Sequence, residues 1–336
     1  MKKIVCFIVY LLLINVQNVK SQSDTLPYEF YDKKIVLYTD FGFSTAPFSI
    51  HYKFKEHIDQ IKYRNNYKNQ VGFGVSYKWA SLRLSFAVGN NARPINRYGR
   101  TNYGSLGFNF TFKKFYFDIE AITVKGYAVK NAYKWDQNLT IQNPNEIKPS
   151  TISYSTGINT WYFHNKLFKM QALMGKTGHF IKEVRTWYIK STFNIYGLKN
   201  DENSLIPSPL IDTNNSKTAS NSYSAIDFGF VPGYAYANRI KNWQISALFG
   251  LGGVIQAKSY NVKDNSRSFL GLAPRYDIKI VGGYSSPSFF LFLVSDFNNK
   301  TIQFNDLVIK QSFYTLKLVG GIRLNALFKK KKTASI

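Results

Sequence analysis

The chain has 336 residues, of which 45% are hydrophobic and 17% aromatic, and its 44 Lys and Arg outnumber 19 Asp and Glu to give a formal charge of +25. Its single cysteine, Cys6, lies near the start, so the rest of the sequence offers neither a disulfide framework nor thiolate chemistry. A strongly basic chain can bind nucleic acid, but these lysines are spread along alternating segments rather than clustered beside stacking aromatics, so we do not expect a nucleic-acid partner.

Residues 1–21 have the pattern of a signal peptide. A basic start is followed by the apolar residues 4–14, and Val19 and Ser21 are the small residues expected just before a cleavage site. An uncleaved membrane anchor is the alternative, but eleven apolar residues are too few for a helix that must span about 30 Å of hydrocarbon. We therefore expect export and cleavage after Ser21, which also removes the cysteine.

Beyond the leader, apolar side chains alternate with small or polar ones, which is the period of a β-strand. In residues 72–79, for example, Phe73, Val75 and Trp79 face one way while the glycines face the other. Twelve segments are candidate strands: 34–44, 70–79, 82–89, 102–112, 115–128, 151–163, 166–196 (interrupted), 223–237, 243–257, 268–284, 287–298 and 312–325.

The pattern predicts an all-β fold, a transmembrane antiparallel β-barrel of about 12 strands over residues 34–328. A periplasmic lead-in at 22–33 precedes it and a basic tail at 329–336 follows it.

The connections fall into two alternating sets. Tight turns are expected at 80–81, 113–114, 164–165, 239–242 and 285–286, and longer polar connections elsewhere. Barrels place short turns in the periplasm and long loops outside, so both termini are expected in the periplasm. Splitting 34–54 and 166–196 into two strands each would give fourteen strands but break this alternation. Residues 48–54 then either extend the first strand or form a short hairpin.

The two faces of the strands differ in chemistry. The outward face is large and often aromatic, as a lipid-facing surface requires. The inward face carries charges of both signs: Asp118, Glu120, Asp227, Arg275, Asp277 and Lys279. Asp118, Glu120 and Asp227 could be glycosidase-like carboxylates, but neutralising lumen Lys and Arg is the simpler role in a small barrel whose interior must be filled or hydrated.

One strand loses its alternation and gathers charged and polar side chains instead. The candidate binding residues there, at the lumen or its rim, are Lys176, His179, Lys182, Glu183 and Arg185. This break could fold inward as a constriction that selects anions electrostatically. The alternative is a distorted strand or an exposed outer loop whose charges are simply solvated.

Other segments give weaker signals. The four histidines lack metal-ligand spacing, and the glycine-rich stretches 249–253 and 281–284 precede no helix, so we expect no metal, no cofactor and no catalytic residue. Glycine there more simply leaves room for a large lumen neighbour. Residues 199–222 are expected to be a mobile outer loop, and 131–150, with Tyr133 and Trp135, a tip able to touch a glycan or a partner protein.

Four motifs stand out along the chain: the Tyr-x-x-Asn stretch at 63–66, the Gly-x-Gly-x-Ser-Tyr-Lys-Trp run at 72–79, the turn and strand at 113–118 and the segment 160–173. Together they resemble an uncharacterised outer-membrane barrel family of Bacteroidota, domain-of-unknown-function family 4421. The break at 176–185 departs from the Ser-Ala-Gly-Ser run of that family. The resemblance implies a barrel in the outer membrane of a Gram-negative cell and no particular activity.

The sequence as a whole therefore predicts a non-enzymatic outer-membrane barrel, and a narrow channel or transport-related barrel for small, possibly anionic solutes is the leading function. A structural barrel whose outer loops bind glycan, lipid or protein is the alternative, and an enzyme acting on lipid or glycan is a third. Expected partners are the phosphates of outer-membrane lipid and lipopolysaccharide, together with the barrel-assembly machinery during insertion.

Overall fold

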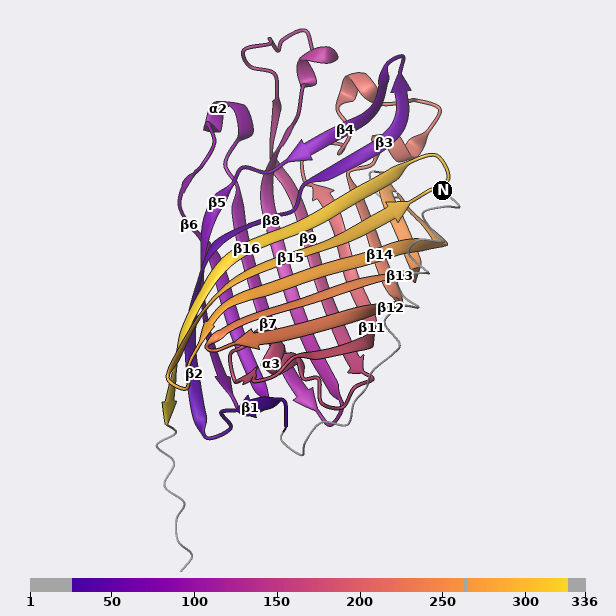
Figure 1. Ribbon diagram of the computed structural model, residues 1–336. Coiled ribbons are helices and arrows are strands. Elements are labelled where there is room, and N and C mark those ends of the chain that lie inside the picture. Colours follow the sequence, from indigo (N-terminus) through magenta and orange to yellow (C-terminus); the bar gives the residue numbers. More distant parts are fainter. Residues whose placement is uncertain (1–25, 263–264, 326–336) are drawn as a thin grey trace, which may run out of the picture.

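The alternating segments form a closed antiparallel ring of twelve strands in a computed structural model that describes residues 26–262 and 265–325 (Figure 1). The ring strands are β2 (Lys34–Thr45), β5 (Lys68–Tyr77), β6 (Ala80–Asn91), β7 (Asn102–Phe112), β8 (Phe115–Val129), β9 (Glu146–Phe163), β11 (Val184–Asn200), β12 (Ser222–Ile240), β13 (Trp243–Val262), β14 (Asn265–Ser285), β15 (Phe289–Gln303) and β16 (Val308–Asn325). Pairing of β16 with β2 closes the ring. The prediction of a twelve-stranded barrel is confirmed.

The ring has two different ends. Connections of two or three residues follow β5, β7, β12 and β14 at one end, which we call the turn end. The opposite loop end carries the hairpin of β3 (Phe48–Lys55) and β4 (Ile58–Arg64), the helix α2 (Ile95–Tyr98) and the 3-10 helices η1 (Ala132–Lys134), η2 (Ser208–Leu210) and η3 (Ser216–Ala219). The same asymmetry separates the short periplasmic turns of outer-membrane barrels from their longer outer loops.

The hairpin of β3 and β4 changes the number of strands along the barrel. β3 continues β2 and pairs with the upper part of β16, while β4 leads into β5 and pairs with the top of β8. At the loop end the wall order β8–β4–β3–β16 therefore replaces β8–β7–β6–β5–β2–β16. Residues 48–54 are thus both an extension of the first strand and one arm of a hairpin, and the alternation of up and down strands is kept.

Three expected connections are wrong. A long connection was expected at 258–267, but β13 and β14 stay paired as far as Val262 and Asn265. Residues 164–165 are not a tight turn, because residues 164–183 form a lobe that contains α3 (Met170–Met174) and β10 (Gly178–Phe180) before β11 begins. The connection between β15 and β16 was expected to be long but is only residues 304–307, because both strands extend further at the loop end than their apolar pattern. The proposed signal peptide and the tail 329–336 lie outside the described residues.

The outward face is apolar, as predicted. Phe73, Phe228 and Leu318 are examples of large side chains that point away from the lumen and are exposed. None of the described helices is long and apolar enough to cross a membrane.

Apolar layers fill the lumen at both ends. At the turn end, Phe168, Leu173 and Phe180 of the lobe are fully buried against inward side chains such as Phe292. At the loop end, Leu205 and Ile206 are buried against Tyr63 of β4 in a similar layer. The loop expected to be mobile is therefore a packed cap, because its own apolar residues enter the mouth of the barrel.

Candidate functional site

Between the two apolar layers the lumen is charged. Its inward-facing positions supply six acidic and six basic side chains: Asp40, Asp118, Glu120, Asp227, Asp277 and Asp296, and Arg83, Lys190, Arg275, Lys279, Lys300 and Lys317. We call this set the lumen network. It confirms the predicted interior of mixed sign, and because the two signs are equal in number the network is formally neutral.

One part of the network centres on Asp40 of β2. Arg83 Nε donates to Asp40 Oδ2 at 2.6 Å and Arg83 Nη2 to Oδ1 at 3.0 Å, while Lys317 Nζ lies 3.3 Å from Oδ1. A Cβ on Gly72 would lie 2.3 Å from Asp40 Oδ2, so only glycine leaves room for the carboxylate. Gly72 of β5 thus makes space for a cluster of two cations and one anion.

A second part consists of one pair within the wall and one pair between strands that are not neighbours. Lys279 Nζ lies 2.6 Å from Asp296 Oδ2 on the adjacent strand β15, and Lys190 Nζ of β11 lies 3.6 Å from Asp277 Oδ2 of β14. Lys190 also lies over the ring of Trp161, at 5.0 Å from its centroid. These contacts satisfy cations that would otherwise be costly to enclose.

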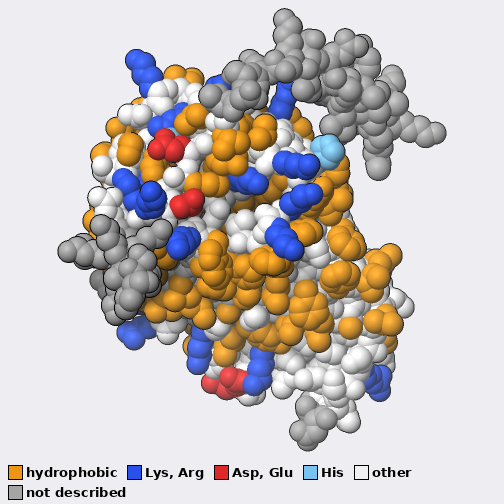
Figure 2. All heavy atoms as spheres, turned by 90° about the horizontal axis from the view of Figure 1, so that it is seen from below, with side chains coloured by type: hydrophobic (Ala, Val, Ile, Leu, Met, Phe, Trp, Pro, Cys, Tyr) orange, Lys and Arg blue, Asp and Glu red, His pale blue; other side chains and the backbone are white. Residues whose placement is uncertain are grey.

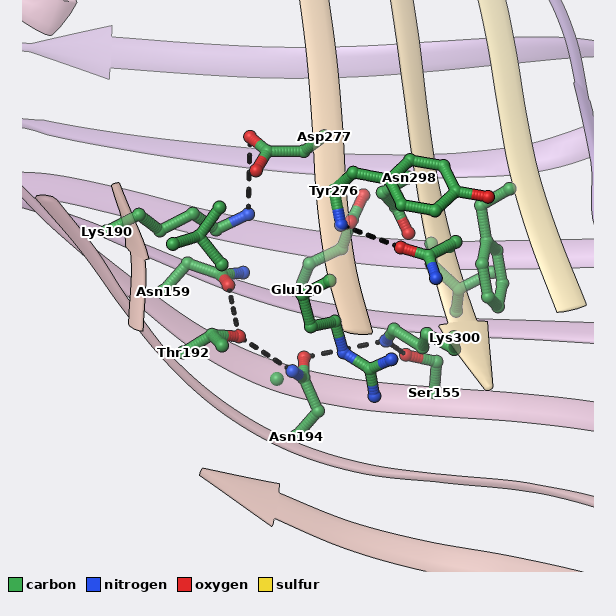
Figure 3. A pocket seen from close by; sticks show the side chains of 16 residues that line it. Glu120, Ser155, Asn159, Lys190, Thr192, Asn194, Tyr276, Asp277, Asn298 and Lys300 are labelled. Carbon is green, nitrogen blue, oxygen red and sulfur yellow. Dashed lines mark hydrogen bonds and ion pairs between the residues drawn. The ribbon is translucent and has the colours of Figure 1, made fainter. Parts of the chain in front are cut away.

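The third part is less completely paired (Figure 3). Arg275 forms an ion pair with Asp227, whose Oδ1 accepts from Asn194 Nδ2 at 3.0 Å. Lys300 contacts Ser155 and Asn194 instead of a carboxylate. Among residues 26–262 and 265–325, Lys300, Glu120 and Asp118 form no ion pair, so this part of the network is held by hydrogen bonds to uncharged groups as well as by charge pairs.

Two adjoining cavities of about 170 and 60 Å³ lie within the network. They share lining residues that include Glu120, Asn159 and Lys190, and we call the combined space the chamber. Arg275 Nε and Asp277 Oδ1 are buried there without a hydrogen-bond partner. Groups of this kind are normally satisfied by water or by a polar ligand.

The floor of the chamber is the lobe. Met170, Met174 and Lys176 line the larger cavity, and Lys176 Nζ lies 4.0 Å from the ring centroid of Tyr38. The lobe is the connection between β9 and β11, and it lies inside the barrel. Its strand β10 pairs with β1 (Tyr28–Phe30) in a two-stranded sheet apart from the wall, so the lobe closes the turn end without being part of the wall.

Two wall side chains hold the lobe in place. Arg323 of β16 donates from Nε to the carbonyl oxygen of Lys176 at 2.9 Å and from Nη2 to that of Gly175. Gln244 of β13 donates to the carbonyl oxygens of Ala172 and Leu173 at 2.9 and 3.2 Å and accepts from the Phe180 amide at 3.0 Å. We call Arg323 and Gln244 the latch.

The structure separates the five residues that the sequence singled out. Lys176 faces the chamber, and His179 is buried in the lobe, where Tyr31 Oη lies 2.8 Å from its Nδ1 and Glu29 lies 3.6 Å from its Nε2. Burial and the neighbouring arginines lower the pKa of His179 to about 4. Three others are exposed: Lys182, Glu183 and Arg185.

The break therefore does fold inward, but only its first half reaches the lumen. The lumen network itself could be found in part from sequence, since alternation placed Asp118, Glu120, Arg275, Asp277 and Lys279 inward. Which of these pair across non-adjacent strands depends on register, and the latch has no sequence signal. Within the described ranges, no group of His, Cys, Asp and Glu is arranged to hold a metal ion.

Comparison with known proteins gives a family and a fold. The model of a family described as a domain of unknown function, DUF4421, matches residues 22–324. No curated protein matches the chain.

Solved outer-membrane structures are similar at low identity. The outer-membrane protease OmpT of Escherichia coli is 9% identical with a TM-score of 0.42, over 90% of this chain and 100% of that one. The toluene transporter TodX of Pseudomonas putida is 7% identical with a TM-score of 0.30, over 88% and 91%. Neisserial surface protein A is 10% identical with a TM-score of 0.24, over 87% and 97%.

Proposed function

Because this chain belongs to the DUF4421 family, which is described only as a domain of unknown function, we propose its function from the lumen itself: a gated outer-membrane barrel in which movement of the lobe lets small polar solutes reach and leave the chamber. The observation that carries this proposal is that a charged chamber is closed at the turn end by a lobe that lies inside the lumen and is not one of the wall strands. The lobe can therefore move without any wall strand leaving the barrel.

The latch is suited to reversible closure. Arg323 and Gln244 bind main-chain carbonyl groups of the lobe, so release exchanges these hydrogen bonds for bonds to water rather than leaving them unmade. The opposing cost is exposure of the buried apolar residues of α3 and β10. The closed state is therefore favoured, and openings should be brief.

The chamber also supports some preference for anions. Lys176 stands at the floor and Lys300 lacks a carboxylate partner, so a solute that passes the lobe meets two available ammonium groups. Glu120 opposes them from the middle of the chamber. We expect a weak anion preference instead of a strict selection.

Single-channel recording in planar bilayers tests the proposal. Because the cap also closes the loop end, the recordings use the refolded full chain with Leu205→Ser and Ile206→Ser, which loosen the cap and leave the lobe as the remaining closure. This background should show rare, brief openings, and adding Arg323→Gln should raise the open probability without changing the current of each opening. Adding Lys300→Gln should change ion preference but not open probability. Silence of the background both with and without Arg323→Gln, with correct folding shown by heat-modifiable gel migration, would refute the gate.

A second function is favoured by one observation at the loop end. The tip between β8 and β9 exposes Ile141, 76% accessible, on a loop anchored from below by Asn145, whose Nδ2 donates to the carbonyl oxygen of Arg97 at 2.8 Å. An apolar side chain held this far from the membrane suits contact with a glycan or protein. Loss of partner binding on Ile141→Ser, with unchanged conductance, would support this role.

A further inference from the structure

Three tight turns at the turn end share an unusual backbone. The first residue of each two-residue connection after β5, β7 and β12 is a lysine with positive φ: Lys78 at 50°, Lys113 at 54° and Lys241 at 54°. This region is disfavoured for L-residues other than glycine, asparagine and aspartate. Asparagine or glycine would relieve the strain in each turn, so the turns are not optimised for folding.

Exposed aromatic side chains adjoin the same three turns. Trp79 follows Lys78, Phe112 precedes Lys113 and Trp243 follows Lys241 by two positions, and these aromatics are 57%, 58% and 63% accessible on the outward face. Lys113 Nζ lies 5.3 Å from the ring centroid of Phe112. Tryptophan and other aromatics on a barrel surface mark the depth of the lipid headgroups. The three ammonium groups therefore stand where lipid phosphates lie.

The charge around the turn end has one dominant sign. Figure 2 views this end and shows Lys and Arg side chains gathered around the rim with few acidic ones among them. Residues 60–117, which include two of the three turns, contain no Asp or Glu. In the turns, the lobe, the lead-in and the start of β11, the exposed acids are Glu29, Asp32 and Glu183. The exposed basic residues there are Lys33, Lys78, Lys113, Lys114, Lys166, Lys182, Arg185 and Lys241.

We infer that Lys78, Lys113 and Lys241, with Lys114 beside the second of them, bind the phosphate groups of anionic phospholipids in the leaflet at the turn end. Lysine at these positions strains the turn but places a cation at headgroup depth. Asparagine would fit the backbone better but would carry no charge. Each lysine near an anionic bilayer surface strengthens binding to that surface roughly fivefold. The inference concerns the rim alone and does not depend on whether the lobe opens.

Tryptophan quenching by brominated lipid tests this in a bilayer. The full chain is refolded into phosphatidylcholine vesicles that contain brominated phosphatidylglycerol or, in a parallel set, brominated phosphatidylcholine at the same fraction. Trp79, Trp187 and Trp243 are exposed at the rim and report the lipid beside it. At low salt, brominated phosphatidylglycerol should quench the wild type several-fold more efficiently, and high salt should reduce the difference.

Three variants separate the rim from general charge. The triple variant Lys78→Asn, Lys113→Asn, Lys241→Asn should lose the preference for phosphatidylglycerol while keeping its fold, because asparagine tolerates the positive φ. Replacing the same three lysines with arginine should retain it. A matched loop-end triple variant, Lys53→Asn, Lys55→Asn, Lys130→Asn, should also retain it. Unchanged preference in the rim asparagine variant, or an equal loss in the loop-end variant, would overturn the inference.

Discussion

Neutralising Asp40 should destabilise the barrel more than its single charge suggests. Asp40 is 1% accessible and holds two cations, Arg83 and Lys317, whose side chains are 21% and 4% accessible. Asp40→Asn keeps the size that fits against Gly72 but leaves both cations without a carboxylate. Removing one partner of a buried pair typically costs 3–5 kcal/mol, and because the Arg83 side chain is 21% accessible we expect about 3 kcal/mol here.

The free energy of unfolding can be measured by denaturant titration of the refolded barrel in detergent micelles, with tryptophan fluorescence as the signal. Asp201→Asn is the matched control, because Asp201 pairs with Lys199 at 2.6 Å but both side chains are about half exposed. That control should be indistinguishable from the wild type, since water and salt screen an exposed pair. A change below 1 kcal/mol for Asp40→Asn would show that the lumen network is already hydrated and would refute the reasoning.

Four further outcomes are expected. Acidification from about pH 6.5 to about pH 4 should destabilise the fold, because unfolding lets His179 take up a proton that burial denies it, and His179→Gln should remove that part of the pH dependence in denaturant titrations. Lys113→Asn should raise the free energy of unfolding by about 0.5–1 kcal/mol, because asparagine adopts the positive φ with less strain than lysine. A free energy of unfolding below that of the wild type would contradict the strain. Ile206→Ala should cost about 2–4 kcal/mol and open residues 201–221 to protease, whereas continued resistance would mean that the cap does not depend on this anchor. Phe228→Arg, on the exposed face, should cost about 2–4 kcal/mol in lipid vesicles, and an unaltered midpoint would place this residue away from hydrocarbon.

The wall of the barrel was predictable because alternation carries two kinds of information at once. Each period-two run in β7 or β12 marks a strand and also states which side chains face lipid. The same rule identified inward charges, and it placed a glycine of the 249–253 run inward, where Gly250 indeed lies under Tyr188.

The closures were not predictable by that rule. Residues 166–183 and 199–222 contain apolar side chains without a strand or helix period, so their burial depends on the space that the ring leaves inside. The polar composition of residues 199–222 favoured a solvated loop, yet Leu205 and Ile206 anchor this segment in the apolar layer at the loop end. The latch is similarly hidden, because Arg323 and Gln244 recognise backbone carbonyl groups, which every sequence has.

Because β3 and β4 replace four wall strands at the loop end, the barrel is narrower there than around the chamber. Twelve strands surround the chamber, but only ten surround its loop end. Since barrel diameter grows roughly in proportion to strand number, the cross-sectional area of the ring falls by about 30% towards the loop end. The wider turn end is closed by the lobe alone, whereas the loop end is closed by the narrower wall together with the packed cap. The chamber is therefore enclosed more tightly at its loop end than at its turn end.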